Sequence, residues 1–81
     1  MAELTAAQKD ILDLICNHDY QLLRDYNGYC YLRKWNIGGI VRDQFGVNRR
    51  SVSRLENLNI LVVNHRDIQG TDYLVFNKPI A

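Results

Sequence analysis

A turn signal followed directly by a short amphipathic segment, within residues 45–58, most constrains how this chain can fold. Gly46 suits the left-handed conformation that ends a helix, and Asn48 suits the cap of a following helix through its side-chain oxygen. At about 100° per residue, Val52 and Leu55 then share one side of that helix, opposite a side rich in arginine. The pattern predicts two helices that meet at a tight corner, the second with a basic outer face.

A helix and a β-hairpin are predicted in the first part of the chain. Thr5 and Gln8 have the spacing of a capping box, and apolar residues follow at helical intervals, so we expect a helix over 6–17. Residues 20–34 surround an Asn-Gly pair with β-prone runs, a strong hairpin signal. Four tyrosines here resemble a base-stacking platform, but we favour packing of a small sheet against a helix: Tyr20, Tyr26, Tyr29 and Tyr31.

A second helix is predicted over 36–45, directly before the corner. Asn36 suits its cap, and four apolar residues would form its inner face: Ile37, Ile40, Val41 and Phe45. Gly38 and Gly39 would each cost about 1 kcal/mol relative to alanine inside a helix. This glycine pair indicates either a close approach to another backbone or a later helix boundary.

The amphipathic segment is expected to form a helix over 48–58, followed by a hairpin over 60–77. Two β-prone runs flank a polar loop in the latter range, and Gly70 suits the tip of that loop. A chain of 81 residues has room for one domain, so we expect residues 1–81 to form a single domain.

Positive charge gathers in the middle of the chain, although the net charge of the whole is only +1. Residues 29–66 hold seven basic and two acidic residues, a balance of +5, whereas residues 1–28 hold two basic and five acidic residues, a balance of −3. A basic face with an acidic back is typical of nucleic-acid-binding proteins. A chance cluster of solvated arginines is the alternative interpretation of charge alone.

Other classes of function find little support in the residues. No apolar run approaches the roughly 18 residues that cross a bilayer, and the first residues lack the basic region of a secretory signal, so we expect a cytoplasmic protein without a membrane partner. Cys16 and Cys30 lack the spacing of a zinc site and are expected to be reduced thiols in apolar space. His18 and His65 neighbour no nucleophile. We therefore expect no metal, no cofactor and no enzymatic activity.

The order of the expected elements, helix, strand, helix, tight turn, helix and two-stranded hairpin, resembles the winged helix-turn-helix family. The likeness covers about residues 5–77, and Asn59 departs from it where relatives often place glycine. Three groups of residues carry the resemblance: Val47 directly after the turn, Ser51-Val52 at the start of the last helix, and Ile60-Leu61-Val62 before the wing. The resemblance implies an α+β fold with three helices, an additional β-hairpin in the N-terminal half and a C-terminal two-stranded wing.

What the resemblance implies for function is sequence-specific binding of double-stranded DNA, usually in transcription regulation. The helix over 48–58 would enter the major groove, and the wing would meet the minor groove or the backbone. Arg50 and Arg54 lie one turn apart and suit guanine edges, while Asn57 suits adenine or a phosphate. The other expected contacts, to phosphates or from the wing, are Arg42, Arg49, Ser51, Ser53, Arg66, Gln69 and Thr71.

Two further expectations concern partners. A homodimer, paired through the first helix or the first hairpin, would supply two half-sites about 10 bp apart. The alternative function is that of a non-enzymatic protein-protein interaction module, such as a phage or plasmid factor that docks on a host protein. Salt dependence separates the two functions, because a DNA binder releases counterions from each phosphate that it neutralises.

Overall fold

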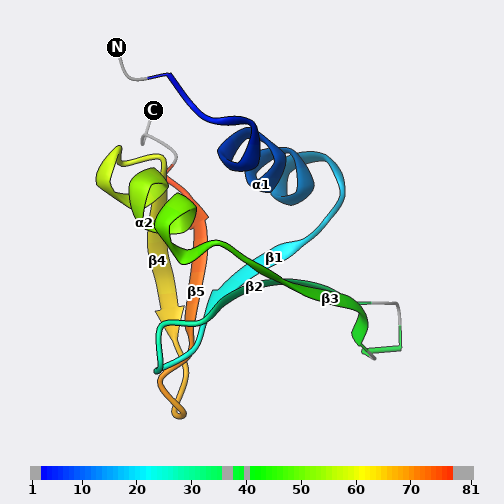
Figure 1. The fold of residues 1–81 in the computed structure, drawn as a ribbon. Coiled ribbons are helices and arrows are strands. Elements are labelled where there is room, and N and C mark those ends of the chain that lie inside the picture. The colour runs from blue at the N-terminus through cyan, green and yellow to red at the C-terminus, as the bar shows by residue number, and fades with distance from the viewer. Residues whose placement is uncertain (1–2, 36–37, 40, 78–81) are drawn as a thin grey trace.

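In a computed structural model, which describes residues 3–35, 38–39 and 41–77, the chain forms two helices and a five-stranded sheet (Figure 1). The strands lie in the order β3-β2-β1-β5-β4, and each neighbouring pair is antiparallel, so the fold class is α+β. In chain order the elements are α1 (Ala6–Asn17), β1 (Gln21–Arg24), β2 (Cys30–Trp35), β3 (Val41–Val47), α2 (Arg49–Asn57), β4 (Leu61–Arg66) and β5 (Asp72–Phe76).

A capping box starts α1 at the residue where the sequence signals it. The Thr5 hydroxyl accepts a hydrogen bond from the backbone N–H of Gln8 at 3.2 Å, and the Gln8 side chain accepts one from the backbone N–H of Thr5 at 2.9 Å. Each bond satisfies a donor that the first turn of a helix leaves without a partner. Ile11 is buried on the inner side of α1 and packs into the core.

The β1–β2 and β4–β5 hairpins turn through loops of the same construction. Asp25 opens the first loop and Asp67 the second, and each carboxylate accepts backbone N–H groups two and four residues later at 2.9–3.0 Å. Gly28 and Gly70 adopt φ values of +87° and +86°, which glycine reaches without steric cost. The first turn is therefore closed by a five-residue loop over 25–29 and not by Asn-Gly alone.

The core is built around β1, the central strand of the sheet. Leu22 lies between Leu32 of β2 and Leu74 of β5, and the three side chains are fully buried. Ile11 of α1 and Val52 of α2 belong to the same cluster. Both helices therefore pack on the same face of the sheet.

Residues 41–45 of the segment expected as a second helix belong to strand β3, so the prediction of a winged helix-turn-helix with three helices is wrong. Its aromatic and β-branched residues pair with β2, with Phe45 opposite Leu32 in the register. Gly39 lies in the turn before the strand with a φ of +77°, so the glycine pair belongs to a turn and not to a helix interior. Asn36, Ile37 and Ile40, also expected in that helix, lie outside the described residues.

The corner at Gly46 and the wing also differ from expectation. Gly46 lies within β3 and is not among the glycines with positive φ. Its missing side chain instead makes room for Tyr29, whose hydroxyl oxygen would lie 2.2 Å from a Cβ at Gly46. The β4–β5 hairpin is no separate wing, because β5 pairs with β1 in the common sheet. The described chain thus holds α2 after a strand, without a helix-turn-helix corner.

Candidate nucleic-acid interface

Side-chain and backbone caps fix both ends of α2. The Asn48 side-chain oxygen accepts the backbone N–H of Arg50 at 2.8 Å and so caps the first turn. At the other end Asn59 takes a left-handed φ of 60°, which asparagine tolerates better than most residues. The backbone N–H of Ile60 then reaches the carbonyl oxygen of Leu55 at 3.0 Å. The sequence therefore sets a nine-residue helix with defined ends.

Opposite sides of α2 have opposite character. Val52 and Leu55 are completely buried and pack against the sheet and α1. The other side presents an exposed polar stripe at i, i+3, i+4 and i+7 spacing, which we call the α2 stripe: Arg50, Ser53, Arg54 and Asn57. Arg49, exposed as well, lies beside the start of this stripe. Burial of one side thus aims the polar side at solvent.

The guanidiniums on α2 stay unpaired within the part of the chain that the structure describes. Among the residues that the structure describes, no carboxylate lies within ion-pair distance of Arg49, Arg50 or Arg54. The ion pairs of the described chain use other basic residues. Three positive charges therefore face solvent within less than two turns of helix, where an anionic ligand can reach them.

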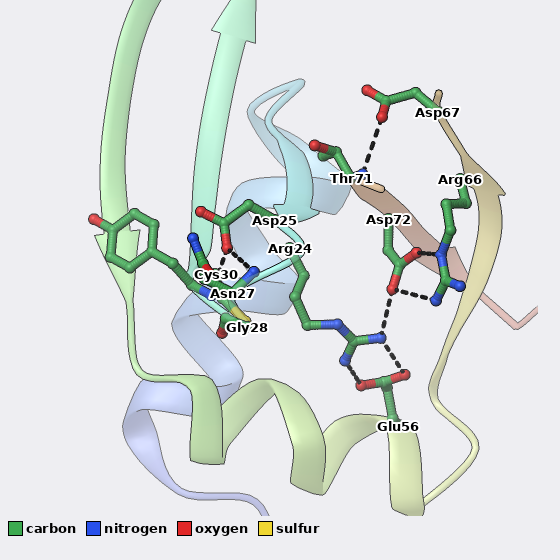
Figure 2. A network of polar contacts seen from close by, with 11 residues as sticks. Arg24, Asp25, Asn27, Gly28, Cys30, Glu56, Arg66, Asp67, Thr71 and Asp72 are labelled. Atoms are coloured by element: carbon green, nitrogen blue, oxygen red, sulfur yellow. Dashed lines mark hydrogen bonds and ion pairs between the residues drawn. The ribbon is translucent and has the colours of Figure 1, made fainter. Parts of the chain in front are cut away.

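Glu56, the acidic residue of α2, is held away from the α2 stripe by Arg24 of β1 (Figure 2). The Arg24 guanidinium binds both carboxylate oxygens of Glu56 and also donates to Asp72 of β5 at 3.0 Å. Arg66 of β4 donates to the same Asp72 carboxylate through two of its nitrogens. This network connects α2 to the β1–β2 and β4–β5 hairpins. The negative charge of Glu56 is paired on the side of α2 that faces the sheet.

The two guanidiniums also favour the charged form of Asp72. The hydrogen bond from Arg66 is the largest cause that lowers the pKa of Asp72, and the bond from Arg24 acts in the same direction against the opposing effect of burial. In the same network the hydrogen bond to Glu56 raises the pKa of Arg24 above its ordinary value. Arg24 and Asp72 are therefore both charged near neutral pH, as an ion-paired anchor requires.

The residues expected on a wing lie on the β4–β5 hairpin and not on the α2 stripe. Arg66 has its guanidinium paired with Asp72, and Thr71 is buried at the end of the β4–β5 loop. Gln69 is exposed in that loop. Of these three side chains, only Gln69 is both exposed and free of an ion pair within the described structure.

Two other expected contacts also lie off the α2 stripe. Ser51 is half-buried and lines a pocket of about 300 Å³ together with Ala7 and Ile11 of α1. Arg42 belongs to β3, but its side chain lies outside the described part of the structure. The structure thus brings together Arg49, Arg50, Ser53, Arg54 and Asn57 from the expected set.

Arg24 was not expected at the site, although an internal repeat in the sequence marks it. Residues 24–32 and 66–74 share the pattern Arg-Asp-x-x-Gly-x-x-Tyr-Leu. In both copies the aspartate and glycine build the hairpin loop, and the leucine enters the core. The two loops lie side by side, since a Cβ at Gly70 would lie 3.2 Å from the Cβ of Tyr26. The repeat therefore predicts two similar hairpins, whose arginines meet at Asp72.

The described residues hold no cluster of three or more His, Cys, Asp or Glu side chains that could bind a metal ion. Cys16 and Cys30 are free thiols, but only Cys30 is buried, so the expectation that both fill apolar space is wrong for Cys16. Neither described helix has the length and apolar character needed to span a bilayer. In comparisons with known proteins, no family, no curated protein and no solved structure matches the chain.

Proposed function

We propose that this protein binds double-stranded DNA through the α2 stripe. The observation that carries the proposal is the set of guanidiniums of Arg49, Arg50 and Arg54, which are exposed and have no carboxylate partner among the described residues. A helix of nine residues is about 14 Å long, and the major groove of B-DNA, about 12 Å wide, admits a helix. The proposal depends on this surface and not on a winged fold.

Each residue of the surface has a distinct role in the proposal. Arg50 and Arg54, one turn apart, donate in pairs to the O6 and N7 acceptors of guanines, and Asn57 reads an adenine further along the groove. Arg49 and Ser53 bind phosphates at the groove wall and set the register of the helix. Base contacts from two neighbouring turns give specificity, while the phosphate contacts supply affinity that does not depend on sequence.

The polar network supports this role from behind α2. Because Arg24 binds Glu56, no acidic side chain of α2 competes with a phosphate for the arginines. The buried Val52 and Leu55 hold the helix against the sheet, so the α2 stripe keeps its orientation before DNA arrives. A surface that is fixed in advance loses less conformational freedom on binding.

We further propose that the protein binds DNA as a homodimer. One nine-residue helix spans only a single half-site, which limits specificity, and two copies related by symmetry would read half-sites about 10 bp apart. β3 and β4 are the edge strands of the sheet, so each has an unpaired side at which two copies can meet. The edge strands thus add a pairing route to the first helix and the first hairpin.

Selection of bound duplexes from a random pool, at two salt concentrations, tests both proposals. We expect enrichment of guanine-containing sites, with two copies of one motif about 10 bp apart if the protein binds as a dimer. Affinity for the selected site should fall steeply with salt, with a logarithmic slope of about 0.9 for each phosphate contacted. Absence of an enriched motif at either salt concentration would contradict sequence-specific binding and favour the protein-interaction alternative. A single motif without a second half-site would contradict the dimer alone.

A further inference from the structure

An aromatic and cationic ladder runs along β2 on the face of the sheet that the helices leave uncovered. Its members alternate along the chain, and we call them the β2 ladder: Tyr29, Tyr31, Arg33 and Trp35. The Tyr29 and Tyr31 rings stack with centroids 5.8 Å apart and planes inclined by 24°. The Arg33 guanidinium lies 5.2 Å from the ring centroids of both Tyr31 and Trp35. Four flat groups therefore follow one another along β2 and the loop residue that precedes it.

Sheet register places this ladder opposite the main core. Cys30 and Leu32 of β2 face the helices and belong to the core, so the alternate residues Tyr31 and Arg33 face the other way. On this second face Leu23 of β1 is completely buried between Tyr31 and Tyr73, its partners on the two neighbouring strands. Tyr31 is thus a buried side chain against which the neighbouring members of the ladder, Tyr29 and Arg33, pack.

The ends of the ladder remain open to solvent. Tyr29 is 55% exposed and Trp35 is 45% exposed. Each ring nevertheless has a partner, because the Tyr29 ring stacks on Tyr31 and the Trp35 indole N–H donates to the Gln21 side chain at 3.2 Å. The backbone N–H of Tyr29 also donates to Asp25 at 2.9 Å. Large apolar rings in fixed positions at a surface are typical of recognition sites.

The face of the sheet that carries the β2 ladder is positively charged. By the sheet register, the acidic residues within the described strands, Asp43 and Asp72, lie on the helix side with Phe45 and Leu74. The Arg33 guanidinium is bonded to the neutral Gln44 and Tyr31, so its positive charge is not cancelled by a carboxylate among the described residues. A ligand that suits this face carries flat rings together with negative charge.

We propose that the β2 ladder binds single-stranded nucleic acid, with unpaired bases stacked on Tyr29 and Trp35 and a phosphate near Arg33. Every base has a flat face, so stacking on such rings tolerates any sequence, and a cation between the rings neutralises the backbone. The bases of a duplex are stacked on one another and are not available to these rings. This surface is therefore a second site, distinct in place and in ligand from the α2 stripe.

Trp35 is the single tryptophan of the chain, so its fluorescence reports directly on this face. Titration with a twelve-nucleotide oligothymidine should quench the fluorescence in a saturable manner. Tyr29→Ala should weaken the binding by about 5- to 150-fold, which is the stacking energy of one base on an aromatic ring converted to affinity. Tyr29→Phe keeps the ring and should bind like the wild type.

Matched controls separate this site from the fold and from the α2 stripe. Tyr26→Ala removes a tyrosine that is 77% exposed but lies in the hairpin loop outside the ladder, and it should leave the quenching unchanged. The double variant Arg50→Ala/Arg54→Ala should also keep it, which distinguishes failure of this proposal from failure of duplex binding. Gly46→Ala should weaken the quenching, since a Cβ there would displace the Tyr29 hydroxyl.

Two results would overturn the proposal. One is the absence of any quenching by oligothymidine with the wild-type protein. The other is an equal affinity for the Tyr29→Ala variant and the wild type, when the circular dichroism spectra of both show the same folded content. Comparison of Tyr29→Ala with Tyr29→Phe keeps the test valid if removal of the ring perturbs the neighbouring strand.

Discussion

At the scale of single residues, Arg24 decides what kind of surface α2 presents. It lies on the central strand and binds two carboxylates from opposite directions, Glu56 on the helix and Asp72 on β5. Both carboxylates are at least three-quarters buried in their side chains, so they gain more from this pairing than surface ions would. The arginines of α2 stay exposed because the half-buried Arg24 pairs with the nearby carboxylates in their place.

The network predicts a loss of stability in acid. Arg66 and Arg24 lower the pKa of Asp72 below that of an unfolded chain, about 3.9, so Asp72 stabilises the fold above that pH and ceases to do so as the pH falls through its folded-state pKa. The urea midpoint of the wild type should therefore drop below about pH 4. Asp72→Asn should lower the free energy of unfolding by about 1–3 kcal/mol at pH 7 and flatten the profile below pH 4.

Asp10→Asn, at an exposed position of α1 outside the network, is the matched control for this measurement. It should leave both the midpoint at pH 7 and the acid profile close to those of the wild type. An Asp72→Asn variant with an unchanged acid profile would show that other carboxyl groups govern the pH dependence.

At the scale of elements, local signals in the sequence were sufficient wherever capping and turn residues decide the structure. The capping box of Thr5 and Gln8 and the cap of Asn48 mark helices that the structure contains, α1 and α2. The strand β3 was missed because its apolar residues also have helical spacing, although its partner β2 is the strand that precedes it in the sequence. The glycine pair at 38–39 was the local sign that a helix would not form there.

The site was predictable to the same extent as α2 itself. A helix with Val52 and Leu55 on one side dictates that Arg50 and Arg54 lie on the other, so periodicity alone places the α2 stripe. The pairing of Arg66 with Asp72 was not expected because it depends on the register of the β4–β5 hairpin, in which the two residues lie opposite each other. The β2 ladder required the register of the sheet, which fixes the face that Tyr31 and Arg33 share.

The anchoring of α2 gives a prediction at this scale. Leu55→Ala removes a completely buried side chain from the contact between α2 and the core and should reduce the free energy of unfolding by about 2–5 kcal/mol. Ser53→Ala, on the exposed side of the same helix, should change it by less than about 0.5 kcal/mol. Urea denaturation followed by circular dichroism measures both. Similar midpoints for the two variants would show that α2 is not held by its inner face.

At the scale of the whole molecule, the sheet separates two candidate surfaces of different chemistry. Both helices pack on one face of the sheet, and the outward side of α2 carries arginines spaced for a groove. The other face carries the stacked side chains of the β2 ladder around the buried Leu23. We propose that duplex DNA binds on the helix side and an unpaired strand on the sheet side, and the Arg24 network joins the helix to the sheet.

The affinity of the Arg50→Ala/Arg54→Ala variant for a selected duplex, measured by fluorescence anisotropy, tests the central claim most directly. The control Lys9→Ala/Lys34→Ala removes the same amount of charge from α1 and β2. Loss of two bidentate base contacts should weaken binding by at least about tenfold, whereas the control should stay close to the wild type. Equal affinities of the wild type and the Arg50→Ala/Arg54→Ala variant, with both proteins folded, would contradict duplex recognition by α2.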